Sequence, residues 1–429
     1  MTHPNLLIKG GHLLDPETGK RRKADLRITG GRISEIGSGL EAGDEEVLDA
    51  GGHLISPGWM DMHVHLREPG QEHKETIASG CAAAAFGGFT AVACMPNTEP
   101  AIHTRDVVEF IIERAAKTAV DVHPIAAVSM DRAGKKLTEM ADLADGGAVA
   151  FSDDGSPVSD GGLMRTALEY SAMLGKPVIN HMEDLTLNPH GHMHEGAVST
   201  RLGLPGIPGL AEEVMIARDI LIAEATGGHI HVAHISTARA VELVREGKRR
   251  GVNVTTEVCA HHFTLTDESV AESDFDTHYK MHPPLRPASD VEAMKEGLRD
   301  GTIDAICTDH APHASFEKEV EFIAAPFGIL GLETAWGLTG RELIRPGVLT
   351  LEEAVKKLTV EPRRILGLPL PKLEEGAPAN LTVFDTTTEW TFEAGHIKSR
   401  SRNTPFVGAP MVGRAWAVYN RGRLVRNQG

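Results

Sequence analysis

The pattern of hydrophobic and polar residues divides this chain into three parts, two ends that look alike and a different middle. Residues 1–56 contain short stretches in which apolar and polar residues alternate, separated by Gly-Gly pairs, and this pattern predicts β-hairpins. Residues 371–429 repeat it, as in ANLTVFDTTTEWTF and GRAWAVYNRGRLVRN. We therefore expect residues 1–56 and 371–429 to form one small β-sandwich domain that is built from both ends of the chain.

The middle part, residues 57–370, alternates between short apolar segments and longer amphipathic ones. The apolar segments are strand candidates, and they cover residues 58–66, 89–97, 120–130, 147–154, 176–183, 229–236, 253–265 and 304–313. Helix candidates lie between them, at residues 104–117, 162–174, 210–226 and 237–250. Eight strands that alternate with helices predict a (β/α)8 barrel, although periodicity alone leaves a doubly wound α/β sheet open.

A barrel of this kind carries its catalytic groups at the C-terminal ends of its strands. Polar residues stand at these positions in the sequence: His63, His65, Asn97, Asp153, Asp154, His181, His234, Asp309, His310 and His313. Strand residues i and i+2 point the same way, so the first two histidines face the barrel mouth together. Imidazoles combined with carboxylates are a ligand set that suits Zn²⁺, and we predict a metal site here.

Each of these features has a structural explanation when it is taken alone. A His-x-His pair can be two hydrogen-bonded histidines, Asp153-Asp154-Gly155 is an ordinary turn sequence, and Asp309 could cap a helix. The combination favours a metal, because six ligand-type residues stand at the ends of five predicted strands. His261 and His262, at the end of the seventh strand, either line this site or are structural.

Eight motifs between residues 57 and 334 resemble those of a known family: MDMHVHLREPG, ACMPNT, FSDDG, NHMED, HVAHIST, KMHPPLR, CTDHAPH and APFGILGLET. In composition and order they resemble the amidohydrolase superfamily and, within it, the dihydroorotases of the long, bacterial type I class. The resemblance implies a zinc-dependent cyclic amide hydrolase of de novo pyrimidine (UMP) biosynthesis. Its reaction would be the reversible cyclisation of N-carbamoyl-L-aspartate to L-dihydroorotate and water.

The resemblance also implies a role for each matching residue. The ligands of one or two zinc ions would be His63, His65, Asp154, His181, His234 and Asp309, with Asp154 as the bridge. Asp309 would also be the general acid and base. The substrate contacts would be His65, Arg67, Asn97, His282, His313, Phe327 and Gly328.

Arg67, His282 and the segment 312–331 each lead to a specific expectation. Arg67 would hold the substrate carboxylate with its guanidinium fork, because such a fork can bind both carboxylate oxygens. The family has asparagine where this chain has His282, so this contact departs from the pattern. Residues 312–331, which follow the last ligand, form either a lid over the site or a plain surface loop.

Two alternatives to a dihydroorotase stay open. Hydantoinases and allantoinases resemble the chain in outline, but they place a carbamylated lysine at the bridge, and residues 147–162 contain no lysine. An inactive dihydroorotase-like scaffold for aspartate transcarbamoylase is the second alternative. Such scaffolds lack metal ligands, whereas all six positions are filled here. The resemblance also suggests aspartate transcarbamoylase as a partner, and we expect a homo-oligomer.

Composition narrows the class of protein further. The formal net charge is −17, and the basic run KRRK at residues 20–23 is short, which disfavours binding to nucleic acid. The four cysteines are widely spaced, as in a reduced cytoplasmic protein. No apolar run approaches the ~20 residues of a membrane helix, and the first residues do not have the pattern of a secretory signal. We therefore expect a cytoplasmic enzyme.

Overall fold

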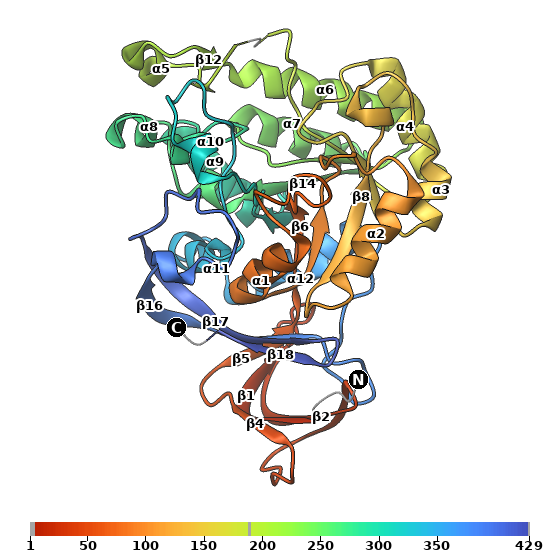
Figure 1. Ribbon diagram of the computed structural model, residues 1–429, viewed down its shortest axis with the longest axis vertical. Helices are drawn as coiled ribbons and strands as arrows, with labels where there is room; N and C mark the ends of the chain where they lie inside the picture. Colours follow the sequence, from red (N-terminus) through yellow and green to blue (C-terminus); the bar gives the residue numbers. More distant parts are fainter. Residues whose placement is uncertain (1–4, 188–189, 428–429) are drawn as a thin grey trace.

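The computed structural model describes residues 5–187 and 190–427, and its largest feature is a barrel of parallel strands (Figure 1). Each strand pairs with its neighbour in chain order, and a bridge between Val64 and His310 joins the last strand to the first. The predicted (β/α)8 barrel is confirmed, and all eight predicted segments contain one of its strands: β6 (Trp59–Val64), β7 (Phe89–Cys94), β8 (Asp121–Ala126), β9 (Ala150–Ser152), β10 (Val178–Asn180), β13 (Ile230–Val232), β14 (Val254–Cys259) and β15 (Ala305–Cys307).

Helices surround the barrel, and they are α1 (Ile77–Gly87), α2 (Arg105–Ala115), α3 (Met140–Asp145), α4 (Gly161–Met173), α6 (Gly209–Thr226), α7 (Ala238–Arg249), α9 (Ala288–Arg299) and α12 (Leu351–Ile365). The four helix candidates of the sequence correspond to α2, α4, α6 and α7. Helix α7 shows why the pattern succeeds. The Thr237 side chain accepts a hydrogen bond from the backbone N–H of Ala240 and caps the first turn, and Val241 and Val244 are buried one turn apart.

Shorter elements interrupt the connections that leave the C-terminal ends of several barrel strands. They are η1 (Met130–Arg132), β11 (Met193–His194), α5 (Ala197–Leu202), β12 (Gly206–Ile207), η2 (Ala260–Phe263), α8 (Glu268–Glu272), η3 (Thr277–Tyr279), α10 (Ser315–Lys318), α11 (Ala335–Thr339) and the π-helical turn η4 (Gly340–Ile344). Because loops at this end of a barrel surround its mouth, these insertions provide the walls of a site.

The two ends of the chain share one eight-stranded sheet, in the order β18-β17-β16-β5-β1-β2-β3, with β4 paired to β1. Strand β16 pairs antiparallel with β5, so Leu381 lies opposite Pro57 and the two ends of the sequence lie side by side (Figure 1). Residues 1–4 and 428–429 of the expected terminal domain lie outside the described residues. The strands are β1 (Leu6–Leu14), β2 (Arg21–Thr29), β3 (Arg32–Gly37), β4 (Glu46–Asp49), β5 (Leu54–Pro57), β16 (Leu381–Thr391), β17 (Pro410–Asn420) and β18 (Arg423–Arg426), and the short turn η5 (Ala394–His396) lies between the last long pair.

The burial of the barrel strands agrees with a barrel that is covered on all sides. Every residue of β6 and β7 is buried, as expected of parallel strands between a helical layer and the barrel interior.

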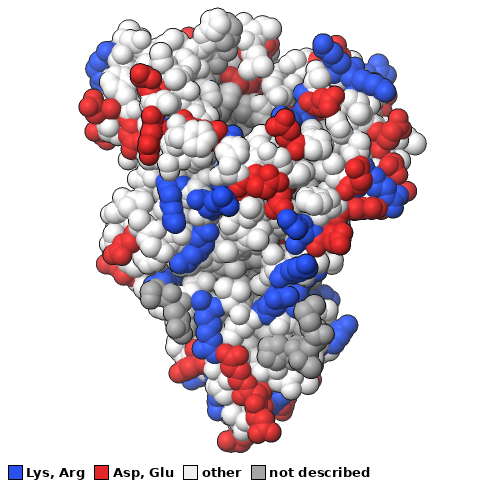
Figure 2. Space-filling model, viewed as in Figure 1, with Lys and Arg blue, Asp and Glu red and all other residues white. Residues whose placement is uncertain are grey.

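Figure 2 shows positive and negative side chains interspersed over the visible face. Within the described part of the chain, every helix is too short or too polar to cross a lipid bilayer.

Candidate active site

The six residues that the sequence predicts as metal ligands lie together at the C-terminal end of the barrel. His63 belongs to β6 and His65 follows it, while the other four stand directly or shortly after β9, β10, β13 and β15. All six side chains are buried. The fold therefore collects residues that are up to 246 positions apart at one place: His63, His65, Asp154, His181, His234 and Asp309.

Asp154 occupies the centre of this group. Its Oδ2 lies 3.6 Å from Nε2 of His63 and 3.6 Å from Nε2 of His65. Its Oδ1 lies 3.5 Å from Nε2 of His234 and 3.7 Å from Nδ1 of His181. One carboxylate thus faces two pairs of histidines, one pair with each oxygen.

Asp309 completes the first pair. Its Oδ1 lies 2.9 Å from Nε2 of His65 and 3.6 Å from Nε2 of His63. The backbone of Asp309 has φ of 46°, and His234 and Arg67 also have positive φ, at 32° and 62°. Residues other than glycine rarely adopt this conformation, and those that do concentrate at functional sites.

Two buried atoms in the group show that its residues fit a metal. Nε2 of His63 and Oδ1 of Asp154 have no hydrogen-bond partner among the described residues. An unsatisfied buried polar atom costs roughly 1–3 kcal/mol, and a cation between the side chains would remove that cost. The ligand atoms within each of two groups lie within 4.8 Å of one another, and these groups are His63, His65 and Asp154, and Asp154, His181 and His234.

The electrostatics keep Asp154 in the form that a metal requires. Burial alone would raise the pKa of this carboxyl, but His63, His181 and His234 outweigh burial and hold the pKa well below its ordinary value. Asp154 is therefore a carboxylate, which can coordinate a cation. Asp153 faces elsewhere, because its carboxylate accepts hydrogen bonds from the backbone N–H and the hydroxyl of Ser129, at 2.9 and 2.5 Å.

A second layer of residues orients the first histidine pair. Nδ1 of His63 lies 2.6 Å from Oε1 of Glu257, which is fully buried in β14. Nδ1 of His65 lies 2.7 Å from Oδ1 of Asn97. Both contacts engage Nδ1, so that Nε2 of each ring faces the group around Asp154. Asn97, predicted as a substrate contact, thus also supports a histidine.

Glu257 is a residue of the site that its place in the sequence did not reveal. Burial alone would raise the pKa of its carboxyl, but the neighbouring His63 and His231 lower it to about 2. The only signal in the sequence was a glutamate within the apolar segment 253–265.

Four of the residues predicted to bind substrate lie in or against the connection that follows β15, and they are Arg67, His313, Phe327 and Gly328. Arg67 is buried, and its Nε donates to the carbonyl of Pro312 over 3.1 Å. Nε2 of His313 donates to the carbonyl of Phe327 over 2.8 Å, and burial lowers the pKa of His313 to about 2, so this imidazole is neutral. Gly328 has φ of 127°, and a Cβ there would lie 2.7 Å from Cβ of Ala311, so the close approach requires glycine.

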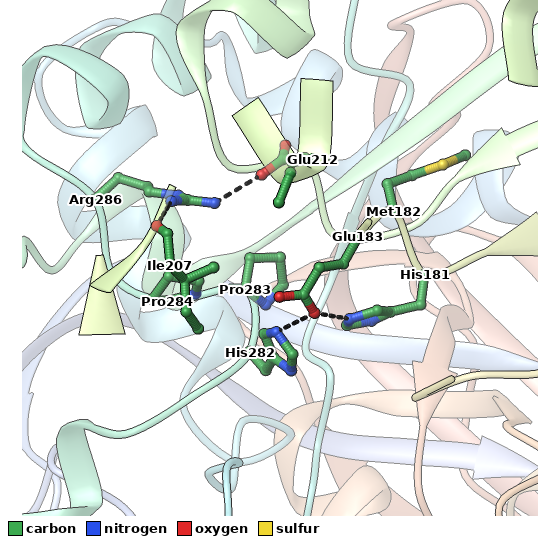
Figure 3. Close-up of a pocket in the computed structure, with 10 residues that line it drawn as sticks. His181, Met182, Glu183, Ile207, Glu212, His282, Pro283, Pro284 and Arg286 are labelled. Atoms are coloured by element: carbon green, nitrogen blue, oxygen red, sulfur yellow. Dashed lines mark hydrogen bonds and ion pairs between the residues drawn. The ribbon is translucent and has the colours of Figure 1, made fainter. Parts of the chain in front are cut away.

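His282 stands between η3 and α9, and Glu183 links it to His181 of the group (Figure 3). Oε2 of Glu183 lies 2.5 Å from Nε2 of His282 and 3.5 Å from Nε2 of His181. The ring of His282 also stacks on Phe327, with centroids 4.8 Å apart. His181, Glu183 and His282 have ligand atoms within 4.8 Å of one another, which is close enough to hold a metal ion. The contact between Glu183 and His282 is also short enough to be a hydrogen bond.

Two buried lysines anchor residues 312–331, the segment expected to be a lid or a surface loop. Nζ of Lys318 donates to the carbonyls of Pro326 and Gly328, at 2.8 and 3.3 Å. Nζ of Lys280 donates to the carbonyls of Phe322 and Ile323, at 2.8 and 3.0 Å. Lys318 therefore holds the backbone on both sides of Phe327, and Lys280 holds the same segment at Phe322 and Ile323.

His261 and His262, which the sequence left between two explanations, are both buried in η2 at the end of β14. Nε2 of His262 donates to the carbonyl of Pro283 over 3.0 Å. Burial lowers the pKa of His261 to about 4 and that of His262 well below its ordinary value. Both rings are therefore neutral, and neither belongs to the six-residue group around Asp154.

Comparison with known sequences places the chain among named relatives. A family model described as Dihydro-orotase-like matches residues 52–240. A protein named dihydroorotase from Pelotomaculum thermopropionicum is 54% identical over 98% of this chain and 98% of its own length. Another protein of that name, from Syntrophus aciditrophicus, is 49% identical over 98% of this chain and 99% of its own length.

Comparison with solved structures gives the same fold. An L-hydantoinase (dihydropyrimidinase) from Arthrobacter aurescens matches with a TM-score of 0.87 at 24% identity, covering 99% of this chain and 97% of that one. A D-hydantoinase (dihydropyrimidinase) from Thermus sp. matches with a TM-score of 0.82 at 26% identity, covering 98% of this chain and 95% of that one.

Proposed function

This chain belongs to the dihydroorotase family and is a cyclic amide hydrolase, and we propose that it interconverts N-carbamoyl-L-aspartate and L-dihydroorotate in pyrimidine biosynthesis. The observation that carries the proposal is the Asp154 carboxylate between two histidine pairs, with a buried arginine close to the same barrel mouth. A ring that bears a carboxylate needs both features. Its amide requires activation, and its acid group requires a cation.

We infer that the metal is zinc, because a mixed set of imidazoles and carboxylates suits it. The first ion would be held by His63, His65 and Asp309, and a second by His181 and His234, with Asp154 shared between them. Zinc, when bound, supplies a Lewis acid that activates water near neutral pH and polarises the amide carbonyl.

Asp309 is the residue that moves the proton in this proposal. In the hydrolytic direction its carboxylate accepts a proton from the attacking water and delivers it to the ring nitrogen as the C–N bond breaks. In the biosynthetic direction it accepts the proton of the ureido nitrogen as the C–N bond forms. It then returns this proton to the carboxyl oxygen whose C–O bond breaks, and that oxygen leaves as water after taking a second proton from solvent. Burial would raise the pKa of Asp309, but the hydrogen bond from His65 and the positive potential of His63 lower it, so the group begins as a proton acceptor.

The remaining residues bind and orient the substrate. Arg67 holds the carboxylate beside the ring, and a guanidinium can do so with two parallel hydrogen bonds. The groups beside the substrate would be His65, Asn97, His282, His313, Phe327 and Gly328. His282 stands where the family has asparagine, and an imidazole can still donate a hydrogen bond to a ring oxygen.

A combined assay and metal analysis tests the proposal. The purified chain is offered dihydroorotate, hydantoin and allantoin, and its zinc content is measured in the same preparation. We expect hydrolysis of dihydroorotate and one or two zinc ions per chain. Turnover of hydantoin or allantoin without dihydroorotate would contradict the substrate. Absent turnover with zinc near zero would instead favour an inactive scaffold.

Association with other chains is a separate part of the proposal. We expect a homo-oligomer, and the family resemblance supports an aspartate transcarbamoylase partner. Light scattering of the purified chain tests the first. Co-purification with a transcarbamoylase, with activity measured before and after the two are mixed, tests the second.

A further inference from the structure

We propose that Cys259, His261 and His262 form a further metal-binding site, for a thiophilic d10 cation such as Cd²⁺ or Zn²⁺. All three side chains are buried, and their ligand atoms lie within 4.8 Å of one another. None of them belongs to the group around Asp154. The proposal therefore goes beyond the hydrolase activity and does not depend on it.

The two histidines present nitrogen atoms that lack partners. Nε2 of His261 and Nδ1 of His262 are buried and have no hydrogen-bond partner within residues 5–187 and 190–427. Because Nε2 of His262 donates its proton to the carbonyl of Pro283, Nδ1 of this neutral ring carries a lone pair. A ring held in this way, with one nitrogen donating to a carbonyl and the other unprotonated, is typical of a metal ligand.

Cys259 supplies the sulfur, and a second thiol supports it. Sγ of Cys259 lies 3.5 Å from Sγ of Cys307, its register partner on β15. Burial raises the pKa of Cys259 to about 11, so this group is a thiol in the absence of a cation. Coordination would release its proton to solvent and leave a thiolate, to which the Cys307 thiol can donate.

The chemistry of this site differs from that of the catalytic group. One sulfur and two imidazole nitrogens favour soft and borderline cations. The six-residue catalytic group, which includes Asp154 and Asp309, offers only nitrogen and oxygen ligands. A signal that requires a metal–sulfur bond therefore reports on this site and not on the catalytic group.

Ultraviolet spectroscopy of the full-length protein with Cd²⁺ tests the proposal, because cadmium–thiolate bonds give a charge-transfer absorption that nitrogen and oxygen ligands do not give. We expect a band that saturates with the amplitude of one cadmium–sulfur bond per chain. Cys259→Ser should abolish it. Cys307→Ser should keep the band but weaken Cd²⁺ binding by roughly 10–100-fold, as losses of supporting hydrogen bonds do. Cys94→Ser, in the buried strand β7, is the matched control and should leave the band unchanged.

Several results would overturn the site. They are the absence of a band in the unmodified protein, a band that survives Cys259→Ser, and a band that Cys94→Ser removes. If Cys259→Ser does not fold, the ¹¹³Cd NMR spectrum of the unmodified protein decides. A resonance typical of one sulfur ligand with nitrogen ligands supports the site, and resonances of nitrogen and oxygen ligands alone contradict it. None of these measurements uses dihydroorotate, so they leave the proposed hydrolase activity untouched.

Discussion

Glu257 of β14 and His63 of β6, two strands with only β15 between them in the barrel, are joined by a 2.6 Å contact between Oε1 and Nδ1. The carboxylate fixes the histidine with Nε2 directed at Asp154. Carboxylates in this position raise the basicity of a metal-binding imidazole and fix its orientation.

We expect Glu257→Gln to weaken zinc binding by roughly 10–100-fold, because the amide keeps the shape of the side chain but removes its charge. Competition with a coloured chelator measures the affinity. Glu246→Gln, on the exposed face of α7, is the control. Equal affinities of the two variants would show that Glu257 does not support the metal.

Asp309→Asn should remove most of the turnover while the zinc content falls only in part. The amide cannot accept and return a proton, whereas the histidine ligands stay in place. General acid–base groups contribute roughly 10²–10⁴-fold, and we expect a loss of kcat in that range or beyond. Steady-state rates and metal analysis on the same sample check this. A nearly normal kcat would contradict the assigned role.

Arg67→Met should raise KM for dihydroorotate by roughly 10–100-fold, since a hydrogen bond to a charged group contributes about 1.5–3 kcal/mol. Arg67→Lys should restore part of this loss, because an ammonium lacks the fork of the guanidinium. Kinetics at several dihydroorotate concentrations separate KM from kcat. If the methionine variant binds dihydroorotate as well as the unmodified protein, the carboxylate is held elsewhere.

Lys318 predicts how stability depends on alkaline pH. Burial, with a smaller effect of Lys280, lowers the pKa of its ammonium group to about 7 in the folded chain, against 10.5 for an ordinary lysine, while Asp276 and Glu317 oppose the shift. Between these two values the unfolded chain binds more protons, so the free energy of unfolding should rise as the pH increases, by about 1.4 kcal/mol for each unit of the pKa difference.

Urea denaturation of the unmodified protein and Lys318→Met, at pH 7 and pH 9, measures this contribution as a difference between the two slopes. The unmodified protein should gain stability relative to the variant at pH 9. The exposed Lys372→Met is the control and should keep the slope of the unmodified protein. Parallel behaviour of Lys318→Met would show that this lysine titrates normally.

The barrel was predictable because strands and helices each have their own period of apolar residues. The six-residue group that includes Asp154 was predictable because its members follow the ends of predicted strands. The partners of these residues were not predictable in the same way. Glu257 stands 194 positions from His63, and an isolated glutamate in an apolar strand does not identify what it contacts. The two lysines that anchor residues 312–331 bind backbone carbonyls, which carry no sequence signal.

The terminal sheet shows a related limit. The alternating pattern identified strands at both ends of the chain, and their resemblance to each other indicated a shared domain. The pairing of β16 with β5, and of β1 with both β4 and β5, depends on edges that only the folded chain brings together.

The shared sheet also has a consequence for the nascent chain on the ribosome. Strand β5 is synthesised early, but the edge that β16 covers stays open until more than 320 further residues have been made. The barrel lies between these two segments, so it can fold first while β1–β5 wait with an unpaired edge. An open strand edge invites pairing with other chains. Cells that translate this protein slowly should therefore accumulate aggregates of incomplete chains, and a chaperone that shields strand edges should reduce them.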